Sequence, residues 1–307
     1  MTRKKNGPPP DPGAFQGPAE LDLAGLDLDL MRTMTAALRE DVLPSDVTTR
    51  LCVPYSLPGR AEARAREPIT VSGLEPFRLA FWLTDRSVKV SLKAKDGDKI
   101  EAGAPIAALE GPAASILTAE RVALNFLGRL SGIATLTARF VAAAGAGGPA
   151  ILDTRKTTPL LRSLEKTAVR HGGGRNHRFS LHDGILIKDN HIKAAGSVTE
   201  AVAKALAGRP HLLRIEVEVD DFEQLKEALK AGAEVILLDN MSPEKLREAV
   251  AIADQFFAPA KRAALLEASG GVSLETIGQI AKSGVDMISV GALTHSARWA
   301  DVGLDWM

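Results

Sequence analysis

The sequence is poor in cysteine, has no net charge and contains no long apolar run. Its single cysteine, Cys52, excludes a disulfide framework, fits a reducing compartment and is more typical of a small buried hydrophobe than of a nucleophile. The 38 basic and 38 acidic residues cancel, which argues against general binding to nucleic acid or to a membrane surface. No apolar run could span a bilayer, and the N-terminus lacks the apolar region of a secretory signal. We therefore expect a cytoplasmic protein.

Familiar catalytic motifs are also missing. The sequence contains no G-x-S-x-G, so acyl transfer by a serine nucleophile is not expected. The glycine run at residues 172–174 is not followed by G-K-[ST], so it is not a P-loop. Four histidines cluster between residues 171 and 191, but their spacings match none of the usual zinc patterns. Nearby basic residues would also repel a cation, and a transition-metal site is therefore not expected.

The first half of the sequence predicts a tail and a strand-rich domain. Residues 1–19 are rich in proline and glycine, which is typical of a disordered segment. Apolar spacing predicts a helix over residues 26–42, and β-branched residues at 46–53 predict a loop that leads into a strand. Residues 60–110 read as short strands separated by Asp-Gly and Gly-Pro turns. Such a segment could also be a carrier module of the biotinyl type, but Lys95 and Lys99 lack the flanking residues that such a module needs.

A long helix is predicted over residues 118–144. Gly128 and Gly132 share one of its faces, and these small residues would allow another backbone to approach closely. Arg121 would lie in the first turn of this helix. A cation is disfavoured at that end unless an anion lies close to it, which makes Arg121 a candidate ligand for an anion.

From residue 150 onwards, apolar strand-like runs alternate with helical ones. The six runs are residues 151–156, 184–190, 213–220, 233–240, 264–271 and 285–293. Parallel neighbouring strands need crossover connections, so this alternation predicts parallel βα units. The natural arrangement is a closed or nearly closed barrel, and a doubly wound sheet is the alternative.

A basic cluster overlaps the first two of these units. Eight bases and only three acids lie between residues 153 and 188; the bases are Arg155, Lys156, Arg162, Lys166, Arg170, Arg175, Arg178 and Lys188. A solvated helix face explains Arg162, Lys166 and Arg170. It does not explain Arg155, Lys156 or Lys188, which abut apolar strand-like runs, and like charges held close together need an anionic partner. We interpret this region as a pocket for a small, highly charged anion.

Polar residues recur where the strands end, which is where βα barrels build their sites. The early strands end in bases, the third and fourth in Glu216, Glu218 and Asp239, and the fifth and sixth in Glu267, Ser269, Gly270, Gly271 and Gly291. Bases bind carboxylates and phosphates, glycine N–H groups bind phosphate, and carboxylates hold Mg²⁺ or stabilise a developing cation. Together they indicate a phosphorylated sugar, a divalent ion and a second substrate that carries carboxylates.

These motifs resemble the quinolinate phosphoribosyltransferase family, also called carboxylating nicotinate-nucleotide pyrophosphorylases. The resemblance covers nearly everything from residue 28 onwards, including LDTRKTTPLLRSLEK, AVRHGGGRNHRFSLHDGILIKDNHI, VILLDNMSPE and LEASGGVS. It implies an α/β fold with a sandwich-like N-terminal α/β domain at 20–130. It also implies an incomplete six-stranded parallel α/β barrel (TIM-like, type II phosphoribosyltransferase) at 131–291. A C-terminal segment at 292–307 would return to the first domain.

The resemblance also implies a reaction and its residues. Phosphoribosyl would pass from phosphoribosyl pyrophosphate (PRPP) to quinolinate with loss of CO₂, Mg²⁺ would be the cofactor, and a homodimer, possibly within a hexamer, would share its active sites. Arg121 would reach the partner's site, while Thr154, Arg155, His177, Arg178 and Lys188 would bind substrate. Lys156, Glu218 and Asp239 would be catalytic, the two acids holding Mg²⁺ mainly through PRPP, and Ser269, Gly270, Gly271 and Gly291 would bind the 5′-phosphate.

Two positions depart from the family pattern, because Leu160 and Ser180 stand where glycine is common. We expect them to alter the local backbone near the pocket rather than the chemistry. Two alternatives stay open. One is a related transferase that accepts another carboxylated ring, such as nicotinate, and the other is an anion-binding barrel without catalytic activity.

Overall fold

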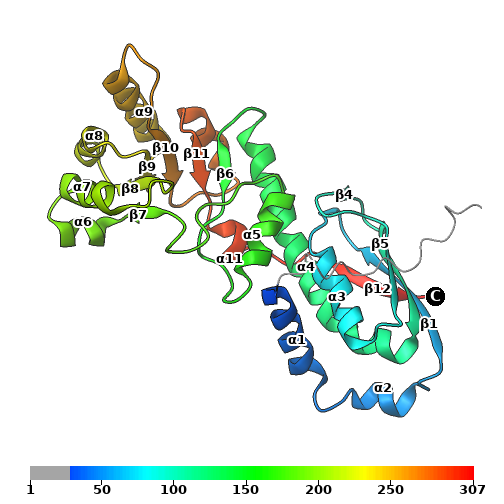
Figure 1. Ribbon diagram of the computed structural model, residues 1–307. Helices are drawn as coiled ribbons and strands as arrows, with labels where there is room; N and C mark the ends of the chain where they lie inside the picture. Colours follow the sequence, from blue (N-terminus) through cyan, green and yellow to red (C-terminus); the bar gives the residue numbers. More distant parts are fainter. Residues whose placement is uncertain (1–27) are drawn as a thin grey trace, which may run out of the picture.

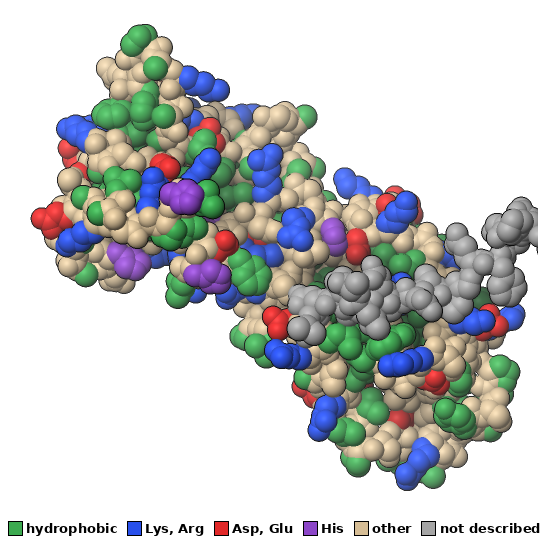
Figure 2. Space-filling model, in the orientation of Figure 1, with side chains coloured by type: hydrophobic (Ala, Val, Ile, Leu, Met, Phe, Trp, Pro, Cys, Tyr) green, Lys and Arg blue, Asp and Glu red, His purple; other side chains and the backbone are tan. Residues whose placement is uncertain are grey.

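A computed structural model of the protein describes residues 28–307 (Figure 1). The predicted tail at residues 1–19 lies outside them. The molecule has two parts, a barrel and an N-terminal α/β domain, joined along the long helix α4 (Ala113–Ala144). Basic and acidic side chains are interspersed over the visible surface of both parts (Figure 2), as zero net charge leads one to expect.

The N-terminal domain packs helices against one face of an antiparallel sheet. The strands run in the order β12-β1-β5-β3, with bounds Val302–Trp306, Pro58–Ala65, Pro105–Pro112 and Lys89–Leu92. A separate pair joins β2 (Ile69–Thr70) to β4 (Lys99–Ile100). Exposed and buried residues alternate along β1, so that Ala61, Ala63 and Ala65 are fully buried beneath the helices. The period of two gives this sheet one core face.

Three predictions for this domain were wrong. Residues 46–53 contain the helix α2 (Val47–Cys52) rather than a loop that leads into a strand, because the Asp46 carboxylate caps this helix by accepting a hydrogen bond from the Thr49 N–H at 2.9 Å. The stretch at 60–110 also contains the helix α3 (Leu74–Thr84), which buries Phe77 and Phe81 in an edge-to-face pair. Cys52 is exposed, contrary to the expected burial. Helix α1 (Leu28–Val42) follows the predicted bounds closely.

Helix α4 contributes to both hydrophobic cores. Its first half packs in the N-terminal domain, and Ile133 and Phe140 pack in the barrel. The predicted close approach at its glycine face is confirmed, because a Cβ on Gly132 would overlap the carbonyl oxygen of Arg298. The segment after the barrel crosses α4 there before β12 pairs with β1. Neither α4 nor any other helix within residues 28–307 is long and apolar enough to cross a membrane.

Six parallel strands form the barrel, as predicted. They are β6 (Ala150–Leu152), β7 (Ile185–Ile187), β8 (Ile215–Val219), β9 (Val235–Asp239), β10 (Leu265–Ser269) and β11 (Met287–Ser289), in the order β6-β11-β10-β9-β8-β7. The first strand pairs with the last, which excludes the doubly wound alternative. Strands β6 and β7 stand at the two ends of this order, so the barrel is incomplete. The backbone of Arg175 bonds to the free edge of β6 instead, its N–H donating to Ile151 O at 2.8 Å.

Helices follow the strands and cover the outside of the barrel. They are α5 (Arg162–His171), α6 (Asp189–Ala195), α7 (Val198–Gly208), α8 (Phe222–Ala231), α9 (Pro243–Phe257), α10 (Ile277–Ile280) with the 3₁₀ helix η2 (Ala281–Ser283), and α11 (Ala292–His295). Strand residues that face these helices, such as Val217, Ile236 and Leu266, are fully buried. The inward-facing residues and the C-terminal strand ends remain to build a site.

Candidate active site

A cavity of about 800 Å³ opens at the C-terminal ends of the barrel strands. Of the residues to which the family resemblance assigns a role, all but Arg121 line it: Thr154, Arg155, Lys156, His177, Arg178, Lys188, Glu218, Asp239, Ser269, Gly270, Gly271 and Gly291. They come from all six strand ends and from the 172–184 segment, over more than a hundred residues of sequence. The parallel topology brings them together, because it places the carboxyl ends of all six strands at one rim.

Two bases follow β6 at this rim, and local hydrogen bonds fix their backbone. The Lys156 N–H donates to Thr154 Oγ1 at 3.1 Å, and the Lys156 carbonyl accepts from Thr294 Oγ1 at 2.7 Å. The side chains of Arg155 and Lys156 are exposed to the cavity. They are therefore free to meet a ligand while their main chain is held in place.

Arg178 brings a second guanidinium towards Arg155. Its Nη1 donates to the carbonyl of Gly184 at 2.9 Å. Burial and then the positive charge of Arg155 lower the pKa of Arg178. Two cations that repel each other at the wall of a cavity favour an anion between them, and paired guanidiniums suit carboxylates in particular.

The acidic residues lie on the adjacent strands β8 and β9. Glu218 is paired with Lys188 in the structure, so these two predicted ligands neutralise each other. Asp239 Oδ2 accepts from the Asn240 side chain at 2.6 Å. A substrate that binds here must compete for Lys188 or share it with Glu218. Carboxylates from neighbouring strands, both facing one cavity, form a donor set that suits a hard divalent cation such as Mg²⁺.

The end of β10 turns sharply at Gly270. This residue has φ +93°, and a Cβ on it would overlap the Asn240 side chain and lie 3.0 Å from the Asn240 backbone nitrogen. Asn240 itself has a positive φ of 53°, and its N–H donates to Ser269 O at 2.8 Å. Strands β9 and β10 thus turn together, which only glycine at position 270 permits. The turn leaves the backbone around Gly271 open to the cavity.

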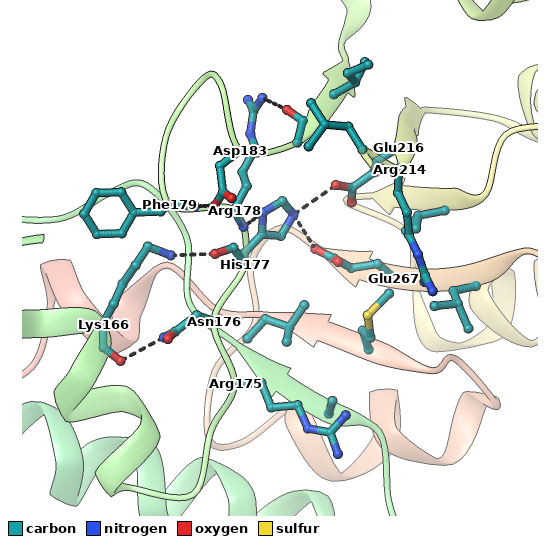
Figure 3. Close-up of a pocket in the computed structure, with 18 of the residues that line it drawn as sticks. Lys166, Arg175, Asn176, His177, Arg178, Phe179, Asp183, Arg214, Glu216 and Glu267 are labelled. Atoms are coloured by element: carbon teal, nitrogen blue, oxygen red, sulfur yellow. Dashed lines mark hydrogen bonds and ion pairs between the residues drawn. The ribbon is translucent and has the colours of Figure 1, made fainter. Parts of the chain in front are cut away.

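His177 lines the cavity, but its ring is already engaged (Figure 3). Its Nδ1 accepts from the Arg178 N–H at 2.7 Å, and its Nε2 lies 3.0 Å from Glu216 Oε2 and 3.7 Å from Glu267 Oε1. The other three histidines of the cluster have separate partners: His171 bonds to Ser72 of the N-terminal domain, His182 to Ser180 and His191 to the Lys188 N–H. The four rings do not converge on one point.

Glu216 and Glu267 lie one layer below the rim. They were predicted as strand-end residues, but each precedes an end residue by two positions and faces inward beneath it. Glu267 is 1% exposed, and burial followed by the charge of Glu216 raises its pKa to about 7. Carboxylate oxygens on both residues lack a hydrogen-bond partner in the structure.

Two interpretations of basic residues were wrong. Lys166 is not on a solvated helix face: it is 2% exposed and pairs with the fully buried Asp153. Arg121 is not in the first turn of its helix, because α4 begins at Ala113, so the argument from the helix dipole does not apply. Arg121 is exposed and lies outside the cavity of its own chain. The single-chain structure therefore leaves its predicted role untested.

Sequence reasoning missed His295, which lines the cavity from α11. Its Nδ1 bonds to Ser296 Oγ at 2.7 Å. The signal available was its position four residues after Gly291, since one helical turn after a strand end points back towards the same rim. The two departures from the family pattern differ in backbone conformation. Leu160 adopts φ +67°, the left-handed conformation that glycine would favour, whereas Ser180 has an ordinary φ.

Comparison with known proteins gives the same family for both parts of the chain. Residues 46–131 match the N-terminal domain, and residues 133–305 the C-terminal domain, of quinolinate phosphoribosyl transferase. The chain is 44% identical to the probable nicotinate-nucleotide pyrophosphorylase (carboxylating) of Bacillus subtilis, over 91% of this chain and 93% of that protein. It is 42% identical to the corresponding protein of Mycobacterium leprae, over 92% and 99%.

The solved structures agree. The nicotinate-nucleotide pyrophosphorylase of Francisella tularensis superimposes with a TM-score of 0.85 at 37% identity, covering 91% of this chain and 96% of that one. Likeness of this extent in sequence and in fold, together with a cavity in which every predicted residue but Arg121 converges, establishes the relationship. The chain belongs to the quinolinate phosphoribosyltransferase family.

Proposed function

We propose that this protein transfers phosphoribosyl from PRPP to quinolinate and releases CO₂ and pyrophosphate, which yields nicotinate mononucleotide for de novo NAD biosynthesis. The observation that carries the proposal is the convergence of four bases, the carboxylates of Glu218 and Asp239, and the Gly270 turn on one cavity. A dicarboxylate ring and a phosphorylated sugar need this combination of charges. A purely anion-binding barrel would have no use for Glu218 and Asp239.

The ring substrate would bind at the basic side of the cavity. Arg155 and Arg178 approach from β6 and from the 172–184 segment, so each could take one carboxylate through a bidentate pair. Lys188 would join them when Glu218 is engaged by the other substrate. Binding of the sugar phosphate would thus complete the ring site by freeing a cation.

The sugar phosphate would occupy the opposite side. Ser269, Gly270, Gly271 and Gly291 offer hydroxyl and backbone N–H groups to the 5′-phosphate, while Lys156 would contact the pyrophosphate. Glu218 and Asp239 would hold Mg²⁺ there, mainly through PRPP, and their oxygen donors fit that ion. When bound, Mg²⁺ would neutralise charge on the leaving pyrophosphate.

Three residues would do the catalytic work. As the pyridine nitrogen attacks C1 of the ribose and the bond to pyrophosphate breaks, positive charge develops on the sugar. Glu218 and Asp239 would stabilise that charge, and Lys156 would stabilise the departing pyrophosphate. The C2–carboxylate bond of the ring then breaks to release CO₂. The electron pair of that bond remains on C2, next to the cationic ring nitrogen, until C2 takes up a proton.

We further propose a cytoplasmic homodimer with shared active sites. Arg121 is exposed on α4 and outside its own cavity, where a partner's site could receive it. Exposed apolar side chains on α2 and its flanking loops offer a surface for such contact: Leu43 is 57% exposed, Leu51 75% and Tyr55 76%. Complementation between an inactive Arg121→Ala chain and an inactive Arg155→Ala chain would test this, since only shared sites restore activity in mixed dimers.

A product assay tests the reaction. The purified protein is incubated with PRPP and Mg²⁺, with quinolinate and nicotinate in separate tubes, and the products are identified by mass spectrometry. We expect nicotinate mononucleotide and CO₂ from quinolinate only, and loss of both when a chelator is added. Product from nicotinate alone would overturn the substrate assignment, and no product in either tube would overturn the proposed reaction.

A further inference from the structure

We propose that Glu216 is a positioning residue that acts through the His177 ring on Arg178, and thereby on the affinity for the ring substrate. The inference rests on the proposed function for the identity of that substrate. Glu216 lies below the rim, in a second cavity of about 870 Å³ at the N-terminal ends of the strands (Figure 3). It does not line the upper cavity. Any effect on substrate must therefore be transmitted.

The first step is the protonation of the ring. A backbone N–H can only donate, so the 2.7 Å bond from the Arg178 N–H requires a lone pair on His177 Nδ1. The proton of the neutral ring is then on Nε2, where it donates to Glu216 Oε2 at 3.0 Å. Neither nitrogen is left to bind a substrate carboxylate. On this geometry we expect His177 to act on the ring substrate through Arg178 rather than by binding a carboxylate itself.

The same hydrogen bond decides against a metal ion here. His177, Glu216 and Glu267 place three potential ligand atoms within 4.8 Å of one another, which is the composition of a cation site. An ion would need the Nε2 lone pair, but Nδ1 is already the acceptor and Nε2 carries the proton. Glu216 is thus the hydrogen-bond partner of the ring, and Glu267 at 3.7 Å is too far to replace it.

The second step leads from the fixed orientation of the His177 ring to Arg178. The backbone of His177 is held on both sides, because its N–H donates to Asp153 Oδ1 at 2.9 Å and its carbonyl accepts from Lys166 Nζ at 3.0 Å. With the backbone fixed, only the side-chain torsions χ1 and χ2 can move the ring, and the hydrogen bond to Glu216 holds them. The ring then orients the Arg178 N–H, while Gly184 O holds its guanidinium. Removing the acceptor at Glu216 leaves a buried donor unpaired, and the ring turns to find another partner.

The variants Glu216→Leu and Glu216→Gln separate this role from others. Leucine removes the acceptor at similar volume, whereas glutamine keeps an oxygen for Nε2–H and removes the charge. We expect Glu216→Leu to raise the KM for quinolinate about tenfold or more and to leave the KM for PRPP within about twofold. Glu216→Gln should stay within about threefold of wild type for both. Arg214→Ala, in the same lower cavity, is the matched control and should change neither.

A second measurement does not depend on turnover or on the folding of variants. Burial lowers the pKa of His177, but the hydrogen bond to Glu216 and the charges of Glu216 and Glu267 outweigh it and hold that pKa above its ordinary value. The ¹⁵N chemical shifts of His177 in the wild-type protein are therefore followed upwards in pH until the ring is neutral, where they report which nitrogen carries the proton. We expect the Nε2–H form, and the Nδ1–H form would overturn the proposal. Equal changes in both KM values, or equal effects of leucine and glutamine, would also overturn it. If the wild type does not use quinolinate, the proposed function fails, and the tautomer still decides the positioning by Glu216.

Discussion

Replacing Lys166 by methionine should destabilise the protein by about 3–5 kcal/mol, although the side chain touches no substrate. Lys166 is 2% exposed and Asp153 is fully buried, and they form an ion pair within the barrel. Without Lys166, Asp153 would keep only the Asn176 side chain at 2.5 Å and the His177 N–H at 2.9 Å. A buried carboxylate held by two neutral donors lacks the charge that offset its desolvation. For a chain of this size the loss corresponds to a fall in Tm of about 10 °C.

The double variant Lys166→Met with Asp153→Asn should recover most of this loss. Burial raises the pKa of Asp153 and lowers that of Lys166, so desolvation outweighs their mutual attraction. Removing both charges together then costs about 2 kcal/mol or less. The measurement is a thermal and urea unfolding series on wild type, the two single variants and the double variant, which forms a double-mutant cycle.

The exposed pair of Lys193 and Asp189, with its 3.0 Å separation on α6, gives the control. Lys193→Met should cost below about 1 kcal/mol, since solvent screens that pair. The reasoning fails if Lys166→Met is as mild as Lys193→Met, or if the double variant loses the sum of both single losses. Equal losses for the two lysines would mean that burial does not set the free-energy cost of breaking an ion pair. Additive losses in the double variant would mean that Lys166 and Asp153 contribute to stability independently.

Four further outcomes are expected. Arg155→Ala should lower kcat/KM by about a hundredfold or more with an unchanged Tm, because Arg155 is exposed in the cavity, and near-normal turnover would refute its role. Gly270→Ala should raise the KM for PRPP far more than Gly271→Ala, since a Cβ at 271 meets no neighbour whereas one at 270 overlaps Asn240. Leu160→Gly should raise stability by about 0.5 kcal/mol, because relief of φ +67° exceeds the added entropy of the unfolded chain, as urea unfolding would detect. The folded-state pKa of Glu267, about 7, exceeds the ordinary value of 4.5. The contribution of Glu267 to stability is therefore fully present below pH 4.5 and is lost as the pH rises through 7. Glu267→Gln should remove the corresponding decrease in Tm over this pH range.

The sequence predicted the fold class and nearly all of the site because both follow from local patterns. Continuous apolar runs of strand length alternate with helical runs, and this order forces parallel strands whose carboxyl ends share a rim. Polar residues at those ends must then meet, whatever the details of packing. Gly128 and Gly132 likewise predicted that another backbone approaches α4 closely. These patterns involve residues close together in the sequence, and they recur along the chain. The sequence alone is therefore enough to detect them.

Other features depended on partners distant in sequence. The burial of Lys166 follows from its pairing with Asp153, which lies outside helix α5. Nothing in the spacing of that helix distinguishes this lysine from the exposed Arg170, one turn further along. The helix at 47–52 was missed because its β-branched residues favour strands, and the Asp46 cap outweighs them. In both cases a specific hydrogen-bond partner overrode the average preference of the residues.

The site likewise has features that local sequence determines and features that depend on distant residues. Sequence alone determined which side chains reach the rim, since strand ends and residue types are local facts. Only the tertiary structure decided how they are engaged: Lys188 pairs with Glu218, and His177 gives both ring nitrogens to Arg178 and Glu216. The physical reason is that hydrogen bonds and ion pairs depend on distances of a few ångströms between residues far apart in the chain. Those distances are set by the packing of the whole barrel.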